Sequence, residues 1–416
     1  MSMTDDLGVS HGTGTPALTA VADHQSKIAA LLAPTPVAAK PLADCLGLAL
    51  AADLAAPISL PPFDNSAMDG YAIRSVDLAG ATPEQPVRLP VHEDIPAGRV
   101  DAPPLQPGTA HRIMTGAQMP PGADAVIPVE RTDGGIEQVR AFASVQPGAH
   151  VRRAGEDVSV GATVLTAGTT LAPAQLGVAA ALGVSELPVH RPVRVLLLST
   201  GSELVAPGTE LQPGQIYESN GLMLAAAVRE AGGEATLLRF VPDDVDAFHA
   251  ALAPHLATTD LLITSGGVSA GAYEVVKDAL TGTGVEFTKV AMQPGMPQGC
   301  GRYRGGVAVV TLPGNPVSAM VSFEVFVRPA LRAAAGHHVT RRPARQATLV
   351  EPLSAPAGKR QYRRGRFDPA TGTVTLQGAP GSHLLAGLAK ANCLLEVPED
   401  VTELAAESTV DVTLLD

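Results

Sequence analysis

The chain has 416 residues, of which 45% are hydrophobic and 17% charged, so it can form several apolar cores and is not a disordered chain. Its 29 Lys and Arg against 41 Asp and Glu give a net charge of −12, and it contains no Trp. Without a long basic stretch or abundant aromatic side chains, the composition argues against a protein that binds nucleic acid.

The cysteines and the apolar runs indicate the compartment. Cys45, Cys300 and Cys393 form no CxxC pair and are odd in number, which argues against a disulfide framework and a cysteine zinc site. Residues 1–20 lack the apolar centre of a signal peptide, and the apolar run 28–57 is broken by charges and prolines. We therefore expect a soluble cytoplasmic protein.

The residue composition changes twice in the first half of the chain. Ala/Leu-rich segments predict helices at 18–33 and 41–55. From residue 61 to about 148, short apolar runs alternate with Pro/Gly turns, which predicts a small β-rich unit. A further apolar helix is expected at 172–183.

After residue 191, apolar strands alternate with helices. The expected strands are 193–199, 235–241, 260–264, 285–291 and 307–312. The expected helices are 219–231, 243–256, 273–280 and 315–335. This alternation predicts a multidomain α/β fold whose open, mainly parallel sheet is covered by helices on both faces in three layers. After residue 336, short strand-like runs predict a small β-barrel or sandwich.

Three of the predicted strands end in loops of glycine and hydroxyl residues, at 200–203, 265–271 and 313–318. Ligands of an open α/β sheet bind beyond the carboxyl ends of its strands, so we expect these loops to converge. Their backbone N–H groups and the helix N-termini that follow them suit an anion. Neither GxGxxG nor GxxxxGK[ST] is present, which argues against a dinucleotide site and a P-loop.

Acidic and basic side chains lie near these loops. Glu203 is either a first-turn helix carboxylate or a magnesium-linked one, since Mg²⁺ binds phosphate oxygens together with one or two carboxylates. Asp243 and Asp244 follow another strand, where they either cap a helix or bind metal. Lys277 and Lys289, two of only six lysines, would give this acidic chain local positive charge.

Seven segments in order carry a resemblance: PPFDNSAMDGYA, IMTGAQMPPGADAVIPVE, RRAGEDV, STGSEL, GQIYESN, TSGGVSAG and LPGNPVSAMVSFE. Together they resemble the molybdopterin molybdenumtransferase family, to which the gephyrin E domain also belongs, and the match spans residues 18 to 416. The resemblance implies that adenylated molybdopterin and molybdate are converted into molybdenum cofactor, with Mg²⁺ as cofactor and AMP released.

The resemblance also implies an elongated homodimer of four-domain chains. The expected domains are a discontinuous N-terminal domain (1–60 and 150–190), a small β-rich domain (61–149), a molybdopterin-binding α/β domain (191–336) and a C-terminal β-barrel (337–416). Further expected partners are the molybdopterin adenylyltransferase and recipient molybdoenzymes. Two alternatives stay open: a non-catalytic molybdopterin-binding scaffold or chaperone paralogue, and the adenylyltransferase itself, which would not need the extra domains.

The loops and the family motifs together define a candidate site. The expected catalytic residues are Glu203, Asp69, Asp243 and Asp244, with Glu203 and Asp243 as magnesium ligands. The resemblance places Asp69 and Thr115 across the dimer interface from the pterin pocket. The expected substrate-binding residues are Thr115, Asp157, Ser199, Thr200, Gly201, Ser265, Gly266, Gly267, Ser269, Lys277, Lys289, Pro313, Gly314, Asn315, Ser318, Arg360 and Ser382.

The chain departs from the family pattern in two places. Ala272 stands where the family commonly has an acidic residue, and Glu274 is the nearest carboxylate. Gln293 and Met296 stand where the family's VAxxPGKP segment has lysines. The second change removes positive charge expected beside an oxyanion, and charged hydrogen bonds are worth about 1.5–3 kcal/mol.

We hypothesise that Lys289, together with an arginine such as Arg360 or Arg364, compensates for this loss. If position 296 contacts molybdate, Met296→Lys should lower the molybdate concentration needed for half-maximal AMP release by about tenfold, because it restores one charged contact. The measurement is AMP release against molybdate concentration. An unchanged concentration dependence would remove position 296 from the molybdate site.

Overall fold

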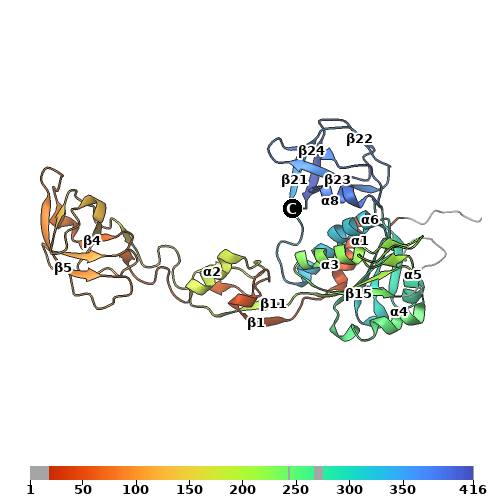
Figure 1. Cartoon of the computed structure of the whole chain (residues 1–416), viewed down its shortest axis with the longest axis horizontal. Coiled ribbons are helices and arrows are strands. Elements are labelled where there is room, and N and C mark those ends of the chain that lie inside the picture. Colours follow the sequence, from red (N-terminus) through yellow and green to blue (C-terminus); the bar gives the residue numbers. More distant parts are fainter. Residues whose placement is uncertain (1–17, 242–243, 267–274, 416) are drawn as a thin grey trace, which may run out of the picture. The chain divides into compact units, whose positions relative to one another are not determined.

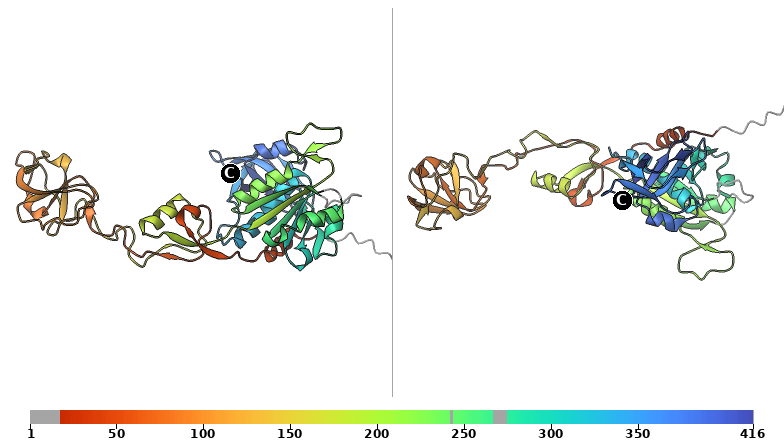
Figure 2. Two further views of the ribbon diagram at one scale, coloured as in Figure 1. Left: turned by 60° about the horizontal axis from the view of Figure 1, so that its bottom comes forward. Right: turned by 90° about the horizontal axis from the view of Figure 1, so that it is seen from above.

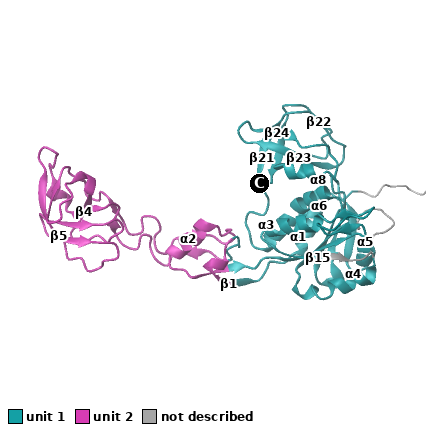
Figure 3. Ribbon diagram, in the orientation of Figure 1, with its two compact units in different colours: residues 1–38, 47–51, 189–416 teal, residues 39–46, 52–188 magenta. Residues whose placement is uncertain are grey.

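The computed structural model describes residues 18–241, 244–266 and 275–415, and the chain divides into two compact units (Figures 1 and 3). The first unit comprises residues 1–38, 47–51 and 189–416, and the second comprises residues 39–46 and 52–188. Within the described ranges, no helix is long and apolar enough to cross a membrane.

A six-stranded sheet with the order β15-β12-β16-β20-β19-β17 forms the centre of the first unit. Its strands are β12 (Arg194–Thr200), β15 (Glu234–Val241), β16 (Leu261–Ser265), β17 (Val285–Lys289), β19 (Pro297–Arg302) and β20 (Ala308–Leu312). The first four strands in the order are mutually parallel. Strand β19 runs antiparallel to β20, and the edge strand β17 pairs antiparallel with β19, so β17 has the direction of the first four strands. The predicted mainly parallel sheet is confirmed, and the ends of β12, β16 and β20 lie at one edge.

Alternate residues of β12 point to opposite faces of the sheet, as the strand period of two requires. Val195 and Leu197 belong to one core, and Leu196 and Leu198 belong to the other. The first core is covered by α1 (Val21–Leu31), α3 (Asn220–Glu230), α6 (Pro316–Ser322) and α7 (Arg328–Ala334). The second core is covered by α4 (Val245–Leu252) and α5 (Val275–Leu280). Figure 2 shows helices on both sides of the sheet, so the expected three layers are present.

Strand β19 was not predicted, and its glycines explain both its low strand signal and its position. A Cβ on Gly299 would lie 2.4 Å from the Thr311 hydroxyl, and one on Gly301 would lie 2.1 Å from the Gly284 carbonyl oxygen. The strand can therefore pair with β20 and β17 only without side chains at these positions. Glycine is disfavoured in strands, so a propensity argument misses such a segment.

The long helix expected at 315–335 is present, but a π-helical turn at Phe323–Val327 separates α6 from α7. Pro329 lies in the first turn of α7 and has no N–H to donate to the carbonyl four residues earlier. That carbonyl, of Val325, accepts a hydrogen bond from Gln25 Nε2 at 3.1 Å instead. Helix α1 thus supplies the partner that the proline removes.

A closed five-stranded barrel follows the α/β part of the first unit. Its strands are β21 (Ala344–Leu349), β23 (Arg360–Asp368), β24 (Thr373–Leu376), β25 (Cys393–Val397) and β27 (Thr409–Leu414). The order β23-β24-β21-β27-β25 closes through pairing of β23 with β25. The short strand β18 (Met292–Gln293) pairs with β23, which joins the α/β part directly to the barrel. Of the two expected forms, barrel and sandwich, the barrel is confirmed.

The second unit contains a five-stranded sheet with the order β7-β4-β6-β5-β8. Its strands are β4 (Gly70–Ile73), β5 (Val87–Ile95), β6 (Ala110–Ile113), β7 (Ala125–Pro128) and β8 (Gln138–Ala141). The same unit includes α2 (Pro173–Ala181) and the short pair β2 (Leu54–Ala55) and β10 (Thr163–Leu165). The β-rich segment and the helix near 172–183 therefore occur as predicted.

The helix predicted at 41–55 is wrong. In its place the chain forms the end of β1 (Val37–Pro41), a 3₁₀ turn at Leu42–Asp44 and turns that lead into β2. Gly47 adopts a φ of 80°, a left-handed conformation that an α-helix cannot contain. The apolar composition of this segment outweighed its Pro and Gly residues in the prediction, although those residues set the backbone.

His24 of α1 is fully buried, and neither of its ring nitrogens has a hydrogen-bond partner. Its ring meets the Phe326 ring edge-on at a centroid distance of 4.8 Å. Burial and, to a lesser extent, the charge of Lys27 lower its pKa from 6.5 to about 4. Burial and the charge of Arg332 likewise lower the pKa of His337 to about 4. Both side chains are therefore neutral in the folded state at neutral pH.

We expect acid to destabilise the first unit between about pH 6.5 and pH 4. In this range His24 and His337 bind protons in the unfolded chain but stay neutral in the folded one. Each of these histidines should lower the free energy of unfolding by about 1.4 kcal/mol per pH unit. His24→Leu should raise the free energy of unfolding at pH 7 by about 1–2 kcal/mol, since two unpaired nitrogens are removed. It should also remove the contribution of His24 to the acid slope.

Urea titrations at pH 7 and pH 5 measure both effects. His338 is exposed, so His338→Leu is the matched control and should change neither value. The same pH dependence in His24→Leu and in the unchanged chain would contradict the role assigned to His24.

Candidate functional site

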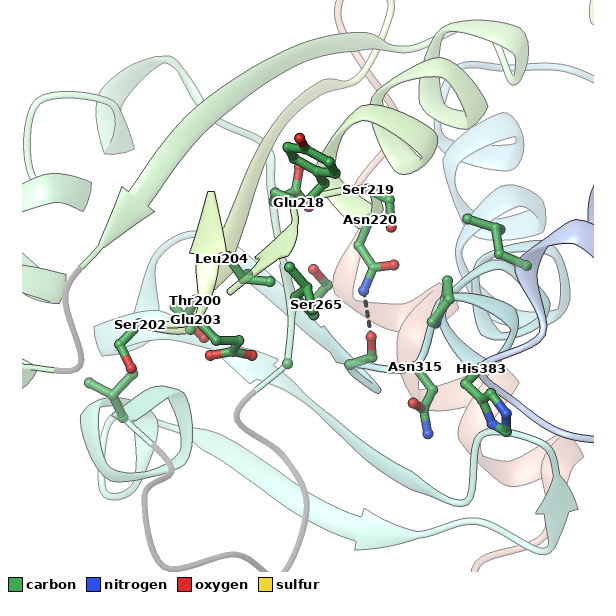
Figure 4. A pocket seen from close by; sticks show the side chains of 18 residues that line it. Thr200, Ser202, Glu203, Leu204, Glu218, Ser219, Asn220, Ser265, Asn315 and His383 are labelled. Carbon is green, nitrogen blue, oxygen red and sulfur yellow. Dashed lines mark hydrogen bonds between the residues drawn. The ribbon is translucent and has the colours of Figure 1, made fainter. Parts of the chain in front are cut away.

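A cavity of about 1,050 Å³ opens at the carboxyl ends of β12, β16 and β20 (Figure 4). The loops after these strands line it with Thr200, Gly201, Ser202, Glu203, Ser265, Gly266, Gly314, Asn315 and Pro316. The start of α3 adds Glu218, Ser219 and Asn220, and the barrel part adds His383 and Leu385. The described parts of the three glycine and hydroxyl loops therefore converge on one cavity, as their positions at strand ends predict.

Glycines allow these loops to approach backbone to backbone. A Cβ on Gly266, whose φ is 92°, would lie 3.2 Å from the Thr200 carbonyl oxygen, and a Cβ on Gly314 would lie 3.3 Å from the Gly266 Cα. Asn220 Nδ2 donates to the Gly314 carbonyl at 2.7 Å (Figure 4). The loops are thus packed against one another and joined to the first turn of α3.

Glu203 lies on one side of this cavity, and Asn315 and His383 lie on the other (Figure 4). The Glu203 side chain is exposed and turns back over Gly201, since a Cβ on that glycine would lie 2.7 Å from Glu203 Oε2. Its carboxylate makes no ion pair with a described residue. A solvent-facing carboxylate beside phosphate-type loops fits a cation that is shared with a bound phosphate.

Glu218 is a second carboxylate in the cavity wall, and sequence reasoning did not select it although GQIYESN contains it. It is buried, and its Oε1 accepts hydrogen bonds from the Gly221 N–H at 2.6 Å and the Ser199 hydroxyl at 2.9 Å. Ser199 Oγ also lies 3.2 Å from Ser265 Oγ. Glu218 therefore caps α3 and joins the end of β12 to that helix.

A second cavity of about 560 Å³ adjoins the first and shares Gly314, Asn315 and His383 with it. Its other described lining residues are Met292, Gln293, Pro294, Gly295, Met296, Pro297, Pro313, Ser318, Lys359, Pro380, Gly381 and Ser382. None of these described residues is acidic, and the sole lysine is the half-buried Lys359. The α/β part and the barrel each supply one wall.

Hydrogen bonds fix the barrel loop 379–384 against α6. The guanidinium of buried Arg364 donates to the carbonyls of Ala379, Gly381 and Leu384. Ser382 Oγ accepts from Asn315 Nδ2 at 2.9 Å, and its carbonyl accepts from Val317 N at 3.0 Å. The loop therefore satisfies an N–H of the first turn of α6 that has no partner within the helix.

The three cations expected to compensate for Gln293 and Met296 are placed elsewhere. Arg360 forms ion pairs with two carboxylates, Glu396 at 2.9 Å and Glu399 at 3.0 Å. Arg364 is occupied by loop carbonyls. Lys289 ends β17 and lines neither cavity. The compensation hypothesis is therefore not supported in the form that the sequence suggested.

The remaining candidates of the first unit divide into three groups. Asp244 caps α4, with its Oδ1 accepting from Ala247 N at 2.7 Å, so the helix-cap alternative describes its position. Lys277 is exposed on α5 and lines neither cavity. The candidates outside the described residues are Asp243, Gly267 and Ser269, together with Ala272 and Glu274.

Asp69, Thr115 and Asp157 belong to the second unit, whereas both cavities belong to the first. Asp69 Oδ1 accepts from the Thr115 N–H at 2.7 Å and from the Thr115 hydroxyl at 2.8 Å. These two hydrogen bonds hold the pKa of the exposed Asp69 carboxyl below its ordinary value. Asp157 is exposed. These two hydrogen bonds fix the Asp69 carboxylate beside Thr115.

The fold and the cavity define a multidomain α/β protein with a cavity at the ends of parallel strands, where the ligands of open α/β sheets bind. Family models match almost the whole chain: MoeA N-terminal region (domain I and II) at residues 19–183, probable molybdopterin binding domain at 197–333, and MoeA C-terminal region (domain IV) at 346–415. The chain belongs to the MoeA family.

Named relatives and solved structures agree with this. The molybdopterin molybdenumtransferase 2 of Mycobacterium tuberculosis (strain ATCC 25618 / H37Rv) is 57% identical over 399 residues, covering 94% of this chain and 98% of that protein. The molybdopterin molybdenumtransferase of Bacillus subtilis is 34% identical over 90% of this chain and 89% of its own. The structure of the MoeA protein from Pyrococcus horikoshii OT3 has a TM-score of 0.81 at 29% identity, covering 96% of this chain and all of that one.

Glu218→Ala should lower the free energy of unfolding by about 1–3 kcal/mol, because the buried Gly221 N–H and Ser199 hydroxyl lose their acceptor. Glu218→Gln keeps an oxygen acceptor and should cost less than about 1 kcal/mol. Urea unfolding of both variants measures the difference. Equal destabilisation by the two substitutions would show that the charge, not the hydrogen-bond acceptor, holds the wall.

Proposed function

We propose that the chain is a molybdopterin molybdenumtransferase, which transfers molybdenum from molybdate to adenylated molybdopterin and releases AMP. Relatives of that name at 57% and 34% identity over most of the chain support the reaction. The observation that carries it is the pair of adjoining cavities at the strand ends. A large nucleotide-linked pterin and a small oxyanion need two adjoining sites of unequal size, and cavities of about 1,050 and 560 Å³ would meet this need.

The first cavity suits the phosphate-containing substrate. Its loops present backbone groups and hydroxyls, and the N-termini of α3 and α6 point their positive dipole ends at it. Two carboxylates, Glu203 and Glu218, would repel a bare pyrophosphate, so a cation is needed there. We propose that Mg²⁺ is this cation and that Glu203 holds it. When bound, Mg²⁺ supplies charge neutralisation on the phosphate oxygens.

Several further features of the assembly are proposals from the family. A homodimer would bring the Asp69–Thr115 pair of one chain to the cavity of its twin, and the division at residues 60, 150, 190 and 336 would give four domains. The molybdopterin adenylyltransferase would supply the substrate, and molybdoenzymes would receive the product. A cytoplasmic location, where such transfers take place, completes this proposal.

A non-catalytic molybdopterin-binding scaffold or chaperone is the second candidate. The observation in its favour is that Gln293 and Met296, which replace the family's lysines, line the second cavity. A scaffold would bind the pterin without consuming it. The two functions therefore differ in whether adenylated molybdopterin is cleaved when molybdate is added.

The purified chain should release AMP from adenylated molybdopterin only when both molybdate and Mg²⁺ are present. Glu203→Ala should reduce the rate by about 10²–10³-fold, because one positioned charge of the site is removed. Its free energy of unfolding should change by less than about 0.5 kcal/mol, since the side chain is exposed.

AMP release measured by chromatography, with Glu210→Ala as the matched control for an exposed carboxylate outside the cavity, tests this. Pterin binding without any molybdate-dependent AMP release would favour the scaffold. AMP release of equal rate with and without molybdate would contradict molybdenum transfer.

A further inference from the structure

The two adjoining cavities differ in charge. The first is lined by the carboxylates of Glu203 and Glu218, whereas the described lining of the second has no carboxylate and includes Lys359. Lys359 is half-buried, and no carboxylate of the described chain forms an ion pair with it. A dianion is therefore favoured in the second cavity over the first.

His383 lines both cavities, together with Gly314 and Asn315, and it is the ionisable member of these three residues. Its side chain is exposed, and Figure 4 shows it beside Asn315 at one end of the first cavity. The imidazole therefore lies where the two cavities adjoin.

The backbone around His383 is held from both sides. Arg364 donates hydrogen bonds to the carbonyl of Gly381, two residues before His383, and to that of Leu384, the residue after it. Ser382, directly before it, is bonded to both the side chain of Asn315 and the backbone of α6. A fixed backbone beneath a solvent-accessible imidazole is the arrangement that a proton donor requires.

We propose that Lys359 holds the molybdate oxyanion in the second cavity and that His383 donates a proton to the oxygen that leaves molybdenum. The proposal rests on the proposed function and assigns two residues of this chain that its family motifs did not indicate. It also replaces the compensation that the sequence suggested, since Lys359 lines the cavity in which Gln293 and Met296 lie.

The chemistry needs such a donor. Two sulfur–molybdenum bonds form as the two thiolates of the pterin attack, and one molybdenum–oxygen bond breaks. The departing oxide takes two protons, one from the His383 imidazolium and one from solvent, and leaves as water. Molybdate, two thiolates and two protons carry the same total charge as the trioxo dithiolate and water. Molybdenum stays hexavalent, so no reductant is required.

The charged groups that face His383 from the neighbouring elements are few among the described residues. Lys359 lies in the second cavity, and Glu203 and Glu218 line the first. Arg364 lies behind the loop, where its guanidinium is used by carbonyls. The imidazole is open to solvent and lines both cavities, so it can take up a proton from water and pass it to an oxygen held in the second cavity.

His383→Gln tests the proton role. It should lower kcat by about 100-fold while changing the KM for molybdate less than threefold, because the amide can occupy the same place and cannot deliver a proton. The pH dependence of kcat should also differ between the unchanged chain and this variant, because the variant has no side chain that can deliver the proton. Added imidazole should restore part of the rate in His383→Ala. His338→Gln, an exposed histidine outside both cavities, is the matched control.

Lys359→Met tests the binding role separately. It should raise the KM for molybdate by about tenfold or more with little change in kcat at saturating molybdate, since one charged contact is lost. Lys390→Met, an exposed lysine on α8 (Leu385–Lys390), is its control and should leave both constants unchanged.

The results separate the inference from the function on which it rests. No molybdate-dependent AMP release by the unchanged chain would overturn the proposed function. An active chain in which His383→Gln keeps its kcat and pH profile would overturn the proton role. An active chain in which Lys359→Met keeps its KM for molybdate would overturn the binding role.

Discussion

Close backbone approach at the ends of three parallel strands is the constraint on which this structure depends. The loop after β16 can touch its neighbours only because Gly266 and Gly314 carry no Cβ, and that contact shapes the first cavity. A methyl group at Gly314 would press on the Gly266 backbone, which cannot rotate away as a long side chain can. The shape of the cavity is therefore determined by the backbone of these glycine loops. The acidic side chains line a wall whose position the backbone already fixes.

The barrel depends on the same edge. Loop 379–384 is bonded through Ser382 to the start of α6, and α6 follows the Gly314 loop directly. Strand β18 pairs with β23 at a second point, between Met292 and Arg360. With two separate attachments, the barrel wall of the second cavity is placed relative to the first cavity. The hydrogen bonds from the buried Arg364 to carbonyls of loop 379–384 fix this loop where the α/β part and the barrel meet.

The sequence allows much of this fold to be predicted, because short apolar runs bounded by turn residues, such as 193–199 and 307–312, are typical of buried strands. It fails where backbone geometry outweighs composition. Strand β19 depends on Gly299 and Gly301 for pairing, and the segment 41–55 has helical composition but a left-handed Gly47. The strand-end loops were predictable from their position, since parallel strands end at one edge. Glu218, Lys359 and His383 were not, because their importance comes from which cavity wall each one occupies.

The separation of charge between the two cavities also explains the substitutions at 293 and 296. Lysines there would add to Lys359 in a cavity whose described lining has no carboxylate to offset them. With Gln293 and Met296, the described lining of the second cavity keeps one lysine, Lys359, and no carboxylate. A site with this single lysine holds an incoming dianion less firmly than a site with three lysines would. The oxygen leaves as neutral water, so the loss of lysine charge acts on the entry of molybdate and has little effect on the release of water.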